Sequence, residues 1–298
     1  MRKLLTANGA EVPFVGLGTF PLQGRDMAEM VKAAYGVGFR LFDTADDYRG
    51  EPGIGIAVKE MEKEGVCKRE DLFLQTKISE NASHEDEPLA GFYFNKRSRF
   101  MQRHTVEELV REKVNLSLRD MNTEYIDSLL IHLPYPGYFE EIWDAMIKLK
   151  NEGKIRYIGV SNFHEHHIEM ISKSGEKPAF NEIYMSPIGT KQEQLEYNLR
   201  NNITIMTYSP LMDMAAHRIP LETIRPISEK YNKSIAQIIL RWNVERGCLP
   251  LPRTTNKKRL AENFDIFNFS LTEEEVMTIS SLNQDYQYIP ESKICPGL

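Results

Sequence analysis

Four side chains suited to proton chemistry stand at or just beyond the ends of short apolar runs. The run "LFD" ends on Asp43, with Tyr48 a few residues further on, "LFLQTK" ends on Lys77 and "SLLIH" ends on His132. A tyrosine has an ordinary pKa near 10, which is too high for efficient proton exchange near neutrality. An adjacent lysine ammonium lowers that pKa, and a carboxylate paired with the lysine keeps the lysine charged.

These four groups suit the reduction of a carbonyl group, in which a hydride adds to carbon and a proton adds to oxygen. His132 can hold the substrate oxygen or relay a proton through its free ring nitrogen. The hydride needs a donor, and a nicotinamide is the one we expect. A structural role remains the alternative for the first segment: Asp43 and Thr44 could start a turn, with Asp46 and Asp47 as solvated loop residues.

A second stretch, "LPRTTNKKRLAENF" (residues 249–264), is suited to binding phosphate. It is predicted to leave a strand and open a helix, with the cations Arg253, Lys257, Lys258 and Arg259 near the helix start. Cations are disfavoured at that end of the helix dipole, and a bound anion would remove the conflict. The alternative is a solvated basic helix start.

The elements that must position these residues alternate along the chain. Eight β-rich runs occur: "FVGLGT", "FRLFDT", "LFLQTK", "YIDSLLIH", "IRYIGVSN", "FNEIYMS", "ITIMTYS" and "CLPLPRT". Helical segments with apolar residues at i, i+3 and i+4 lie between them. An open dinucleotide-binding sheet should carry G-x-G-x-x-G, and the two candidates, at Gly16 and Gly53, both lack the third glycine. We therefore predict an α/β fold, a (β/α)8 TIM barrel, with an N-terminal hairpin turned at Asn8-Gly9 closing its bottom. Such a barrel places its chemistry at the carboxyl ends of the strands.

Local signals mark the helix boundaries and one long insertion. Capping boxes are predicted at Thr105, Ser234 and Thr272, and Gly247 is expected to end a helix. Residues 78–104 show no periodicity, so we predict a long loop after the third strand, either a mobile insertion or a lid. Its basic residues could recruit an anionic substrate; they are Lys96, Arg97, Arg99 and Arg103. A C-terminal tail is expected at about 283–298, and the whole chain is expected to form one domain.

Composition excludes several classes of function. The chain has 298 residues and a net charge of −6, so nucleic acid is not an expected partner. No apolar segment approaches the roughly 20 residues of a membrane span, and three scattered cysteines fit a reduced, cytoplasmic protein. The histidines around His164 and His167 do not fit H-E-x-x-H, so no metal is expected. A monomer is favoured, with the oligomeric state left open.

Several ordered motifs resemble those of the aldo-keto reductase family along nearly the whole chain. "DTADDY" resembles its second-strand motif, "LQTK" its lysine strand, "SLLIHLP" its histidine strand and "IGVSNF" its fifth-strand motif. "TYSPL" and "LPRTTNKKRLAENF" resemble its nicotinamide-stacking and adenosine-phosphate segments. The resemblance implies a TIM barrel, NADPH dependence, a small carbonyl substrate and a catalytic tetrad of Asp43, Tyr48, Lys77 and His132.

The resemblance also implies a set of cofactor-binding residues. Ser161, Asn162 and Glu182 would hold the nicotinamide carboxamide, and Tyr208 would stack on the ring. Thr19, Ser209 and Leu211 would also line the cofactor, the last two along its pyrophosphate. The adenosine end would be held by Arg253, Thr254, Arg259, Glu262 and Asn263. Two arginines at that end favour capture of a 2′-phosphate, hence NADPH over NADH.

Three departures from the family pattern limit what carries over. Glu182 stands where the family usually has glutamine; we expect it to accept a hydrogen bond from the carboxamide, while its charge stabilises the oxidised ring. Phe20 and Leu133 stand where many members have tryptophan, so the substrate pocket is remodelled. The insertion at residues 78–104 is longer than is usual in the family.

Two alternative functions stay open. One is a catalytically weak, cofactor-binding regulatory subunit of the same fold. The other is a hydrolase that uses Asp43 with Glu182 as a carboxylate pair, which would leave Lys77 unexplained.

Overall fold

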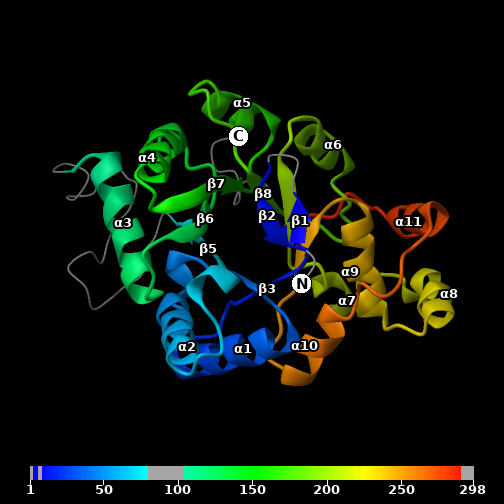
Figure 1. Ribbon diagram of the computed structural model, residues 1–298. Coiled ribbons are helices and arrows are strands. Elements are labelled where there is room, and N and C mark those ends of the chain that lie inside the picture. The colour runs from blue at the N-terminus through cyan, green and yellow to red at the C-terminus, as the bar shows by residue number, and fades with distance from the viewer. Residues whose placement is uncertain (1–2, 6–8, 80–103, 290–298) are drawn as a thin grey trace.

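The computed structural model describes residues 3–5, 9–79 and 104–289, and its centre is a ring of eight parallel strands (Figure 1). Neighbours along the chain are neighbours in the ring, from β3 to β10. The strands are β3 (Gly16–Gly18), β4 (Leu41–Asp43), β5 (Phe73–Ile78), β6 (Ile126–Ile131), β7 (Ile155–Ser161), β8 (Phe180–Tyr184), β9 (Thr204–Tyr208) and β10 (Leu249–Leu251). A parallel bridge between Gly18 and Arg253 joins the first strand to the last. The eight predicted strands and the (β/α)8 barrel are confirmed.

Alternate side chains fill the inside of the barrel, because successive residues of a strand point to opposite faces. Toward the bottom the filling is apolar, and it includes Leu41, Phe180 and Leu249. Gly16 leaves the space that these side chains need, since a Cβ there would collide with Leu41 and Leu251. Two residues further along β4 and β8 the inward positions become polar, at Asp43 and Glu182.

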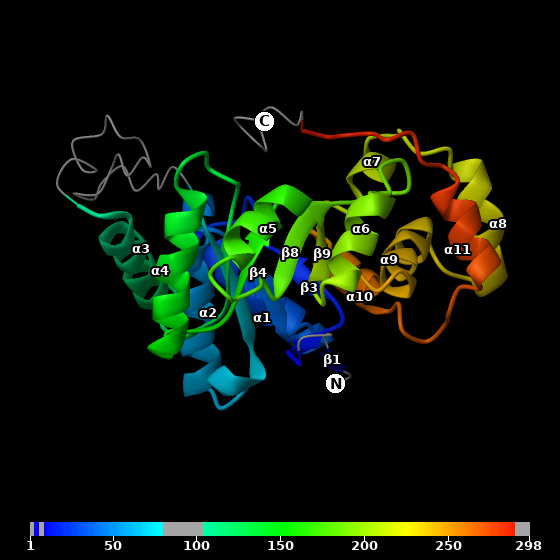
Figure 2. The same cartoon turned by 90° about the horizontal axis from the view of Figure 1, so that it is seen from above.

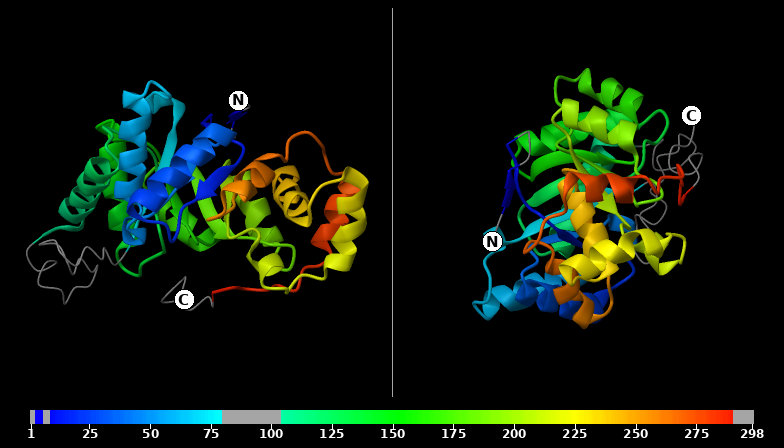
Figure 3. Two further views of the ribbon diagram at one scale, coloured as in Figure 1. Left: turned by 90° about the horizontal axis from the view of Figure 1, so that it is seen from below. Right: turned by 90° about the vertical axis from the view of Figure 1, so that its right-hand side faces the viewer.

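An antiparallel hairpin of β1 (Lys3–Leu5) and β2 (Glu11–Pro13) closes one end of the ring. Ala10 and Val12 belong to the same buried cluster as the interior residues of the barrel. The hairpin lies at the opposite end from α7, as Figures 2 and 3 show from several sides. The predicted hairpin is thus present, while Asn8 of its predicted turn lies outside the described residues.

Helices surround the ring (Figure 1). They are α1 (Gly24–Val37), α2 (Glu51–Lys63), α3 (Val106–Asp120), α4 (Phe139–Asn151), α5 (Glu165–Ser172), α6 (Gln192–Arg200), α7 (Met212–Ala215), α8 (Leu221–Tyr231), α9 (Ile235–Glu245), α10 (Lys257–Phe264) and α11 (Glu273–Ser280), with short 3-10 turns η1 (Asp46–Tyr48) and η2 (Arg69–Asp71). In α4, the side chains of Phe139, Ile142 and Trp143 lie on one face of the helix and are buried, as their spacing predicts.

The local boundary signals are present as predicted. Thr105, Ser234 and Thr272 each form a capping box at the start of their helix, and Gly247 follows α9 with a φ of 78°. Of the predicted insertion, residues 80–103 lie outside the described part of the chain, and so do residues 290–298 of the predicted tail. Among the described helices, none combines the length and the apolar character that crossing a membrane requires.

Candidate active site

Two of the four predicted side chains form a buried ion pair inside the barrel. The Lys77 ammonium donates to Asp43 Oδ1 at 2.6 Å and to the carbonyl of Thr44 at 3.0 Å. Lys77 comes from β5 and Asp43 from the neighbouring β4, and both residues are almost completely buried. Burial opposes the charge of Lys77, but Asp43 and Glu182 outweigh it and raise its pKa above the ordinary value. The lysine is therefore a fixed positive charge.

The other two predicted side chains meet at the mouth of the barrel. The Tyr48 hydroxyl, in η1 after β4, lies 3.4 Å from His132 Nε2, and His132 follows β6. The Lys77 ammonium lies 5.4 Å from the centre of the Tyr48 ring. Burial, and then the charges of Lys77 and Lys113, lower the pKa of His132 to about 3, so the imidazole is neutral at physiological pH.

The pKa of Tyr48 moves in the direction opposite to the sequence-based expectation. Lys77 lowers it as expected, but burial raises it more, and the carboxylates of Asp43, Glu182 and Asp47 add to that increase. The prediction that Lys77 lowers the pKa of Tyr48 overall is therefore wrong for the protein without coenzyme. Tyr48 is a protonated phenol throughout the physiological range, which leaves it able to give a proton.

A polar network on the Nδ1 side of His132 contains Ser79, Asp46 and Lys113, and no sequence motif pointed to Ser79 or Lys113. Ser79 Oγ lies 2.7 Å from His132 Nδ1, which leaves Nε2 directed at Tyr48. Asp46 accepts from the backbone N–H of Ser79 at 3.0 Å and pairs with Lys113 of α3 at 2.8 Å. Lys113 also donates to the Ser79 carbonyl at 2.6 Å. Asp46 is buried, so the reading of it as a solvated loop residue is wrong.

Glu182 lies inside the barrel beside the Lys77–Asp43 pair. Its Oε1 is 3.3 Å from the Lys77 ammonium, and its Oε2 accepts from Gln75 Nε2 at 2.9 Å. The same Gln75 nitrogen donates to Asp43 Oδ1 at 3.0 Å. Both oxygens of Glu182 thus face the residues around Lys77. Sequence reasoning placed Glu182 near a nicotinamide and did not foresee this second contact.

The residues assigned to the nicotinamide end gather next to this cluster. Ser161 Oγ donates to the carbonyl of Glu182 at 3.0 Å, and Asn162 Nδ2 donates to Ser161 Oγ at 3.0 Å. Tyr208, at the end of β9, donates from its hydroxyl to Asn162 Oδ1 at 3.0 Å. Thr19 Oγ1 donates to the Asp43 carbonyl at 2.8 Å. Thr19, Ser161, Asn162, Glu182 and Tyr208 therefore come from the carboxyl ends of four strands, β3, β7, β8 and β9, at one end of the barrel.

The residues assigned to the phosphates follow the last two strands. Ser209 has a left-handed φ of 52°, and Leu211 precedes α7. Arg253 and Arg259 are exposed, Thr254 and Asn263 are buried, and Glu262 is half-buried. The first turn of α10 contains Lys257, Lys258 and Arg259 and no acidic residue. This arrangement keeps three cations at the helix end that prefers an anion.

The two residues predicted to reshape the substrate pocket differ in exposure. Phe20 is 50% exposed, and its ring meets the Tyr48 ring edge-on with centroids 5.2 Å apart. The Arg253 guanidinium also lies over the Phe20 ring, 5.7 Å from its centroid. Leu133 is half-buried and packs against the main core. Phe20 thus forms an apolar wall beside the phenol.

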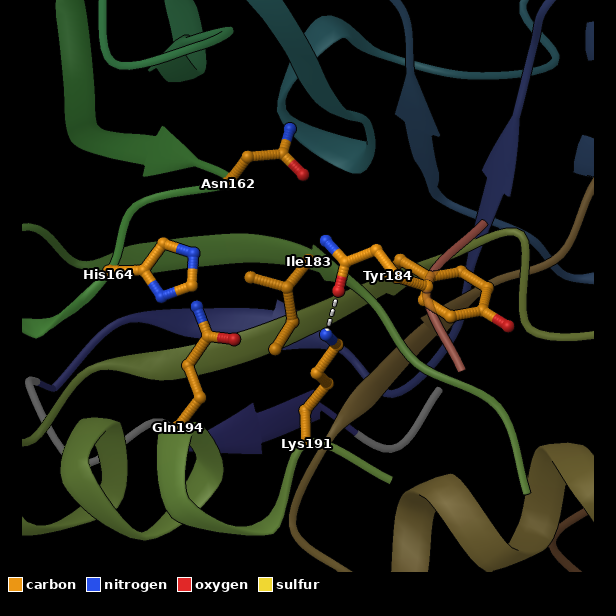
Figure 4. A pocket seen from close by; sticks show the side chains of 7 residues that line it. Asn162, His164, Ile183, Tyr184, Lys191 and Gln194 are labelled. Carbon is orange, nitrogen blue, oxygen red and sulfur yellow. Dashed lines mark hydrogen bonds between the residues drawn. The ribbon is translucent and has the colours of Figure 1, made fainter. Parts of the chain in front are cut away.

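A small pocket adjoins this site beyond Asn162 (Figure 4). Its lining includes His164, Ile183 and Tyr184, and Lys191 hydrogen-bonds there to Gln287. None of its lining residues belongs to the set of Asp43, Tyr48, Lys77 and His132. The pocket is therefore a neighbour of the polar cluster and not its centre.

Comparison with known proteins places this geometry in a family. A sequence model described as "Aldo/keto reductase family" matches residues 15–284. A glyoxal reductase of Bacillus subtilis (strain 168) is 37% identical, over 95% of this chain and 93% of that protein. A methylglyoxal reductase of Escherichia coli (strain K12) is 31% identical, over 95% and 94% respectively. A Bombyx mori aldo-keto reductase solved in complex with NADP superposes with a TM-score of 0.81 at 29% identity, covering 98% of this chain and 96% of that one.

Proposed function

Since the chain belongs to the aldo/keto reductase family, we propose that it reduces aldehyde or ketone carbonyls to alcohols, with NADPH as the hydride donor and Tyr48 as the general acid. The observation that carries the proposal is the pair of contacts inside the barrel mouth: Lys77 on Asp43 and Tyr48 on His132. A proton donor, a fixed positive charge and a neutral hydrogen-bonding ring converge there on one point.

The donor set fits a nicotinamide dinucleotide phosphate. When bound, the nicotinamide supplies the hydride. Ser161 and Asn162 offer a hydroxyl and an amide to its carboxamide, and Tyr208 offers an aromatic face. Arg253 and Arg259 offer two guanidinium groups to a 2′-phosphate, which supports NADPH over NADH.

The chain's own residues then divide the work of proton transfer. Tyr48 holds its proton until the substrate oxygen gains negative charge, because an alkoxide is a stronger base than a phenolate. Lys77 stabilises the phenolate that remains, and Asp43 fixes the lysine in place. Neutral His132 positions the oxygen through Nε2, with Ser79 on its other nitrogen.

Small dicarbonyl compounds are the substrates we propose to test first. Two relatives are named for glyoxal and methylglyoxal reduction. We expect Phe20, whose ring meets that of Tyr48 edge-on, and the side chain of Leu133 to form apolar walls of the substrate pocket. Larger aromatic aldehydes and ketones complete the panel, because Phe20 offers an edge and a face for ring packing.

The test compares the wild type with Tyr48→Phe. We expect NADPH absorbance to fall steadily with active substrates, and kcat to drop by about 10²–10⁴-fold in the variant while NADPH still binds. Fluorescence titration of NADPH measures that binding. Tight NADPH binding by the wild type with no turnover across the panel would reject catalysis and favour the regulatory-subunit alternative.

A further inference from the structure

Two buried carboxyl groups share the same two hydrogen-bond donors inside the barrel. Lys77 lies 2.6 Å from Asp43 Oδ1 and 3.3 Å from Glu182 Oε1. Gln75 Nε2 donates to Asp43 Oδ1 at 3.0 Å and to Glu182 Oε2 at 2.9 Å. Asp43 is 4% exposed and Glu182 2% exposed, so water does not screen one carboxyl from the other.

The charges in this cluster do not balance if every group is ionised. One ammonium, that of Lys77, then faces two carboxylates, and like charges this close in a buried site do not both ionise readily. The carboxyl group with the longer contact to the ammonium is that of Glu182. Burial, followed by the Asp43 charge, raises the pKa of Glu182 above its ordinary value, and Lys77 only partly opposes this.

Within the part of the chain that the structure describes, the two strands that flank Glu182 place no charged residue opposite it. On β7 its register partner is Ser161, and on β9 it is Met206. Among the described residues, Tyr48 and Asp47 also interact with the charge of Lys77, and the ionised form of either one adds negative charge. A positive charge brought to this end of the barrel would therefore act directly on Glu182.

We propose that Glu182 stores a proton beside Lys77 and releases it to solvent when an oxidised, positively charged nicotinamide ring binds. This inference rests on the proposed function, because it assumes that the ring lies against Ser161, Asn162 and Glu182. The balance is simple: the protonated enzyme plus NADP⁺ gives the ionised enzyme with NADP⁺ and one free proton. Glutamine, which the aldo-keto reductase family usually has at this position, does not ionise and therefore has no proton to release.

The stored proton also adjusts the acid. With Glu182 neutral, Lys77 has one carboxylate partner and exerts more of its charge on Tyr48. With Glu182 ionised, the added negative charge opposes the phenolate, in the direction that Glu182 already exerts on the Tyr48 pKa. Glu182 is thus a positioning residue: its protonation state changes how strongly the Lys77 ammonium favours the phenolate form of Tyr48.

Calorimetric binding experiments test the proton release. NADP⁺ and NADPH are each titrated into wild type, Glu182→Gln and Glu51→Gln, in buffers of different ionisation enthalpy. Subtracting NADPH from NADP⁺ removes protons linked to the shared 2′-phosphate. We expect wild type and Glu51→Gln to release more protons with NADP⁺, and Glu182→Gln to show no difference. Glu51 is the matched control, since it is also a buried glutamate with a raised pKa but lies on α2.

The affinity ratio gives a second signature of the same linkage. While Glu182 titrates, the preference for NADP⁺ over NADPH should rise by about tenfold per pH unit in the wild type and stay flat in Glu182→Gln. Equal proton release with both coenzymes in the wild type, or an unchanged difference in Glu182→Gln, would overturn the proposal.

A titration without coenzyme separates this inference from the proposed function. The carboxyl carbon of Glu182, labelled with carbon-13 and assigned by its loss in Glu182→Gln, should titrate well above the ordinary glutamate range. An ordinary midpoint would overturn proton storage. Failure of both coenzymes to bind would overturn the proposed function, and the carbon-13 midpoint would still decide whether Glu182 holds a proton.

Discussion

Replacing Lys113 with methionine tests whether the buried network behind His132 is a real support. The Lys113 ammonium lies 2.8 Å from Asp46 Oδ2, and the two side chains are 2% and 7% exposed. Methionine is unbranched and only one heavy atom shorter than lysine, so it fills most of the space of the lysine stem and the main change is the loss of the ammonium. Asp46 then remains buried as an uncompensated carboxylate.

The expected cost follows from that burial. Removing one partner of a buried ion pair costs about 3–5 kcal/mol of unfolding free energy. The matched surface control is Lys148→Met, since Lys148 pairs with Glu107 at 2.5 Å but is 57% exposed. An exposed pair of this kind contributes only about 0–1 kcal/mol. The two variants should therefore differ by several kcal/mol despite similar contact distances.

The assay is urea unfolding of wild type, both single variants and the double variant Lys113→Met/Asp46→Asn. The double variant should recover much of the loss, because asparagine removes the buried charge and its oxygen still accepts from the Ser79 N–H. Turnover per folded Lys113→Met enzyme should also fall, by up to about 100-fold, as Ser79 and His132 shift.

Two results would refute this reasoning. If Lys113→Met costs no more than Lys148→Met, the Asp46 contact carries no net stability. If the double variant is no more stable than Lys113→Met alone, the loss does not come from an unpaired Asp46 and the coupling is absent.

Two further predictions concern pH dependence and coenzyme choice. Burial raises the pKa of Glu51 from 4.5 to about 7, against a weaker opposing hydrogen bond from Thr76. The native state therefore holds a proton that the unfolded state loses between about pH 4.5 and pH 7. Over that window the wild type should lose on the order of 3 kcal/mol relative to Glu51→Gln, and parallel urea-unfolding curves across pH would contradict this. Arg259→Ala should weaken NADPH binding by about 10–100-fold and NADH binding far less, as measured by fluorescence titration. Lys148→Ala, which removes an exposed lysine of α4, is the control, and an equal loss of both coenzymes in Arg259→Ala would argue against a 2′-phosphate contact.

The barrel was predictable because its signals are local and repeated. Each strand is a short β-rich run, the helices between them have apolar stripes, and some of these helices start at a capping residue such as Thr105 or Ser234. Strand ends in a parallel barrel meet at one edge, so Asp43 and Lys77 could be placed together before their contact was seen. Order along the chain was enough for these conclusions.

The surroundings of the predicted residues were not predictable in the same way. Lys113 sits in a charged stretch of α3 and reads as a surface residue, yet it shares the buried face with Val110, Val114 and Ser117. That position within an apolar stripe was the available signal. The sequence allows Asp46 to be a solvated loop residue because its partner, Lys113, lies far along the chain.

The prediction that the Tyr48 pKa is lowered was wrong for a different reason. Sequence can show that a lysine and a tyrosine will be neighbours, but burial depends on everything packed around them. Here desolvation, together with the neighbouring acidic groups, outweighs the effect of one ammonium on the Tyr48 pKa. A residue pair predicts an interaction, whereas the sum of many partly opposing interactions requires the folded structure.

The bridge between Gly18 and Arg253, which closes the barrel, has a consequence for folding during synthesis on the ribosome. The ring joins its first strand to its last, so the edge of β3 has no strand to pair with until β10 has been synthesised. Asp43, Tyr48, Lys77 and His132 all emerge in the first half of translation, long before that edge is covered. A chain released before Leu249 would carry all four side chains together with an open β-edge, and open edges of this kind template aggregation.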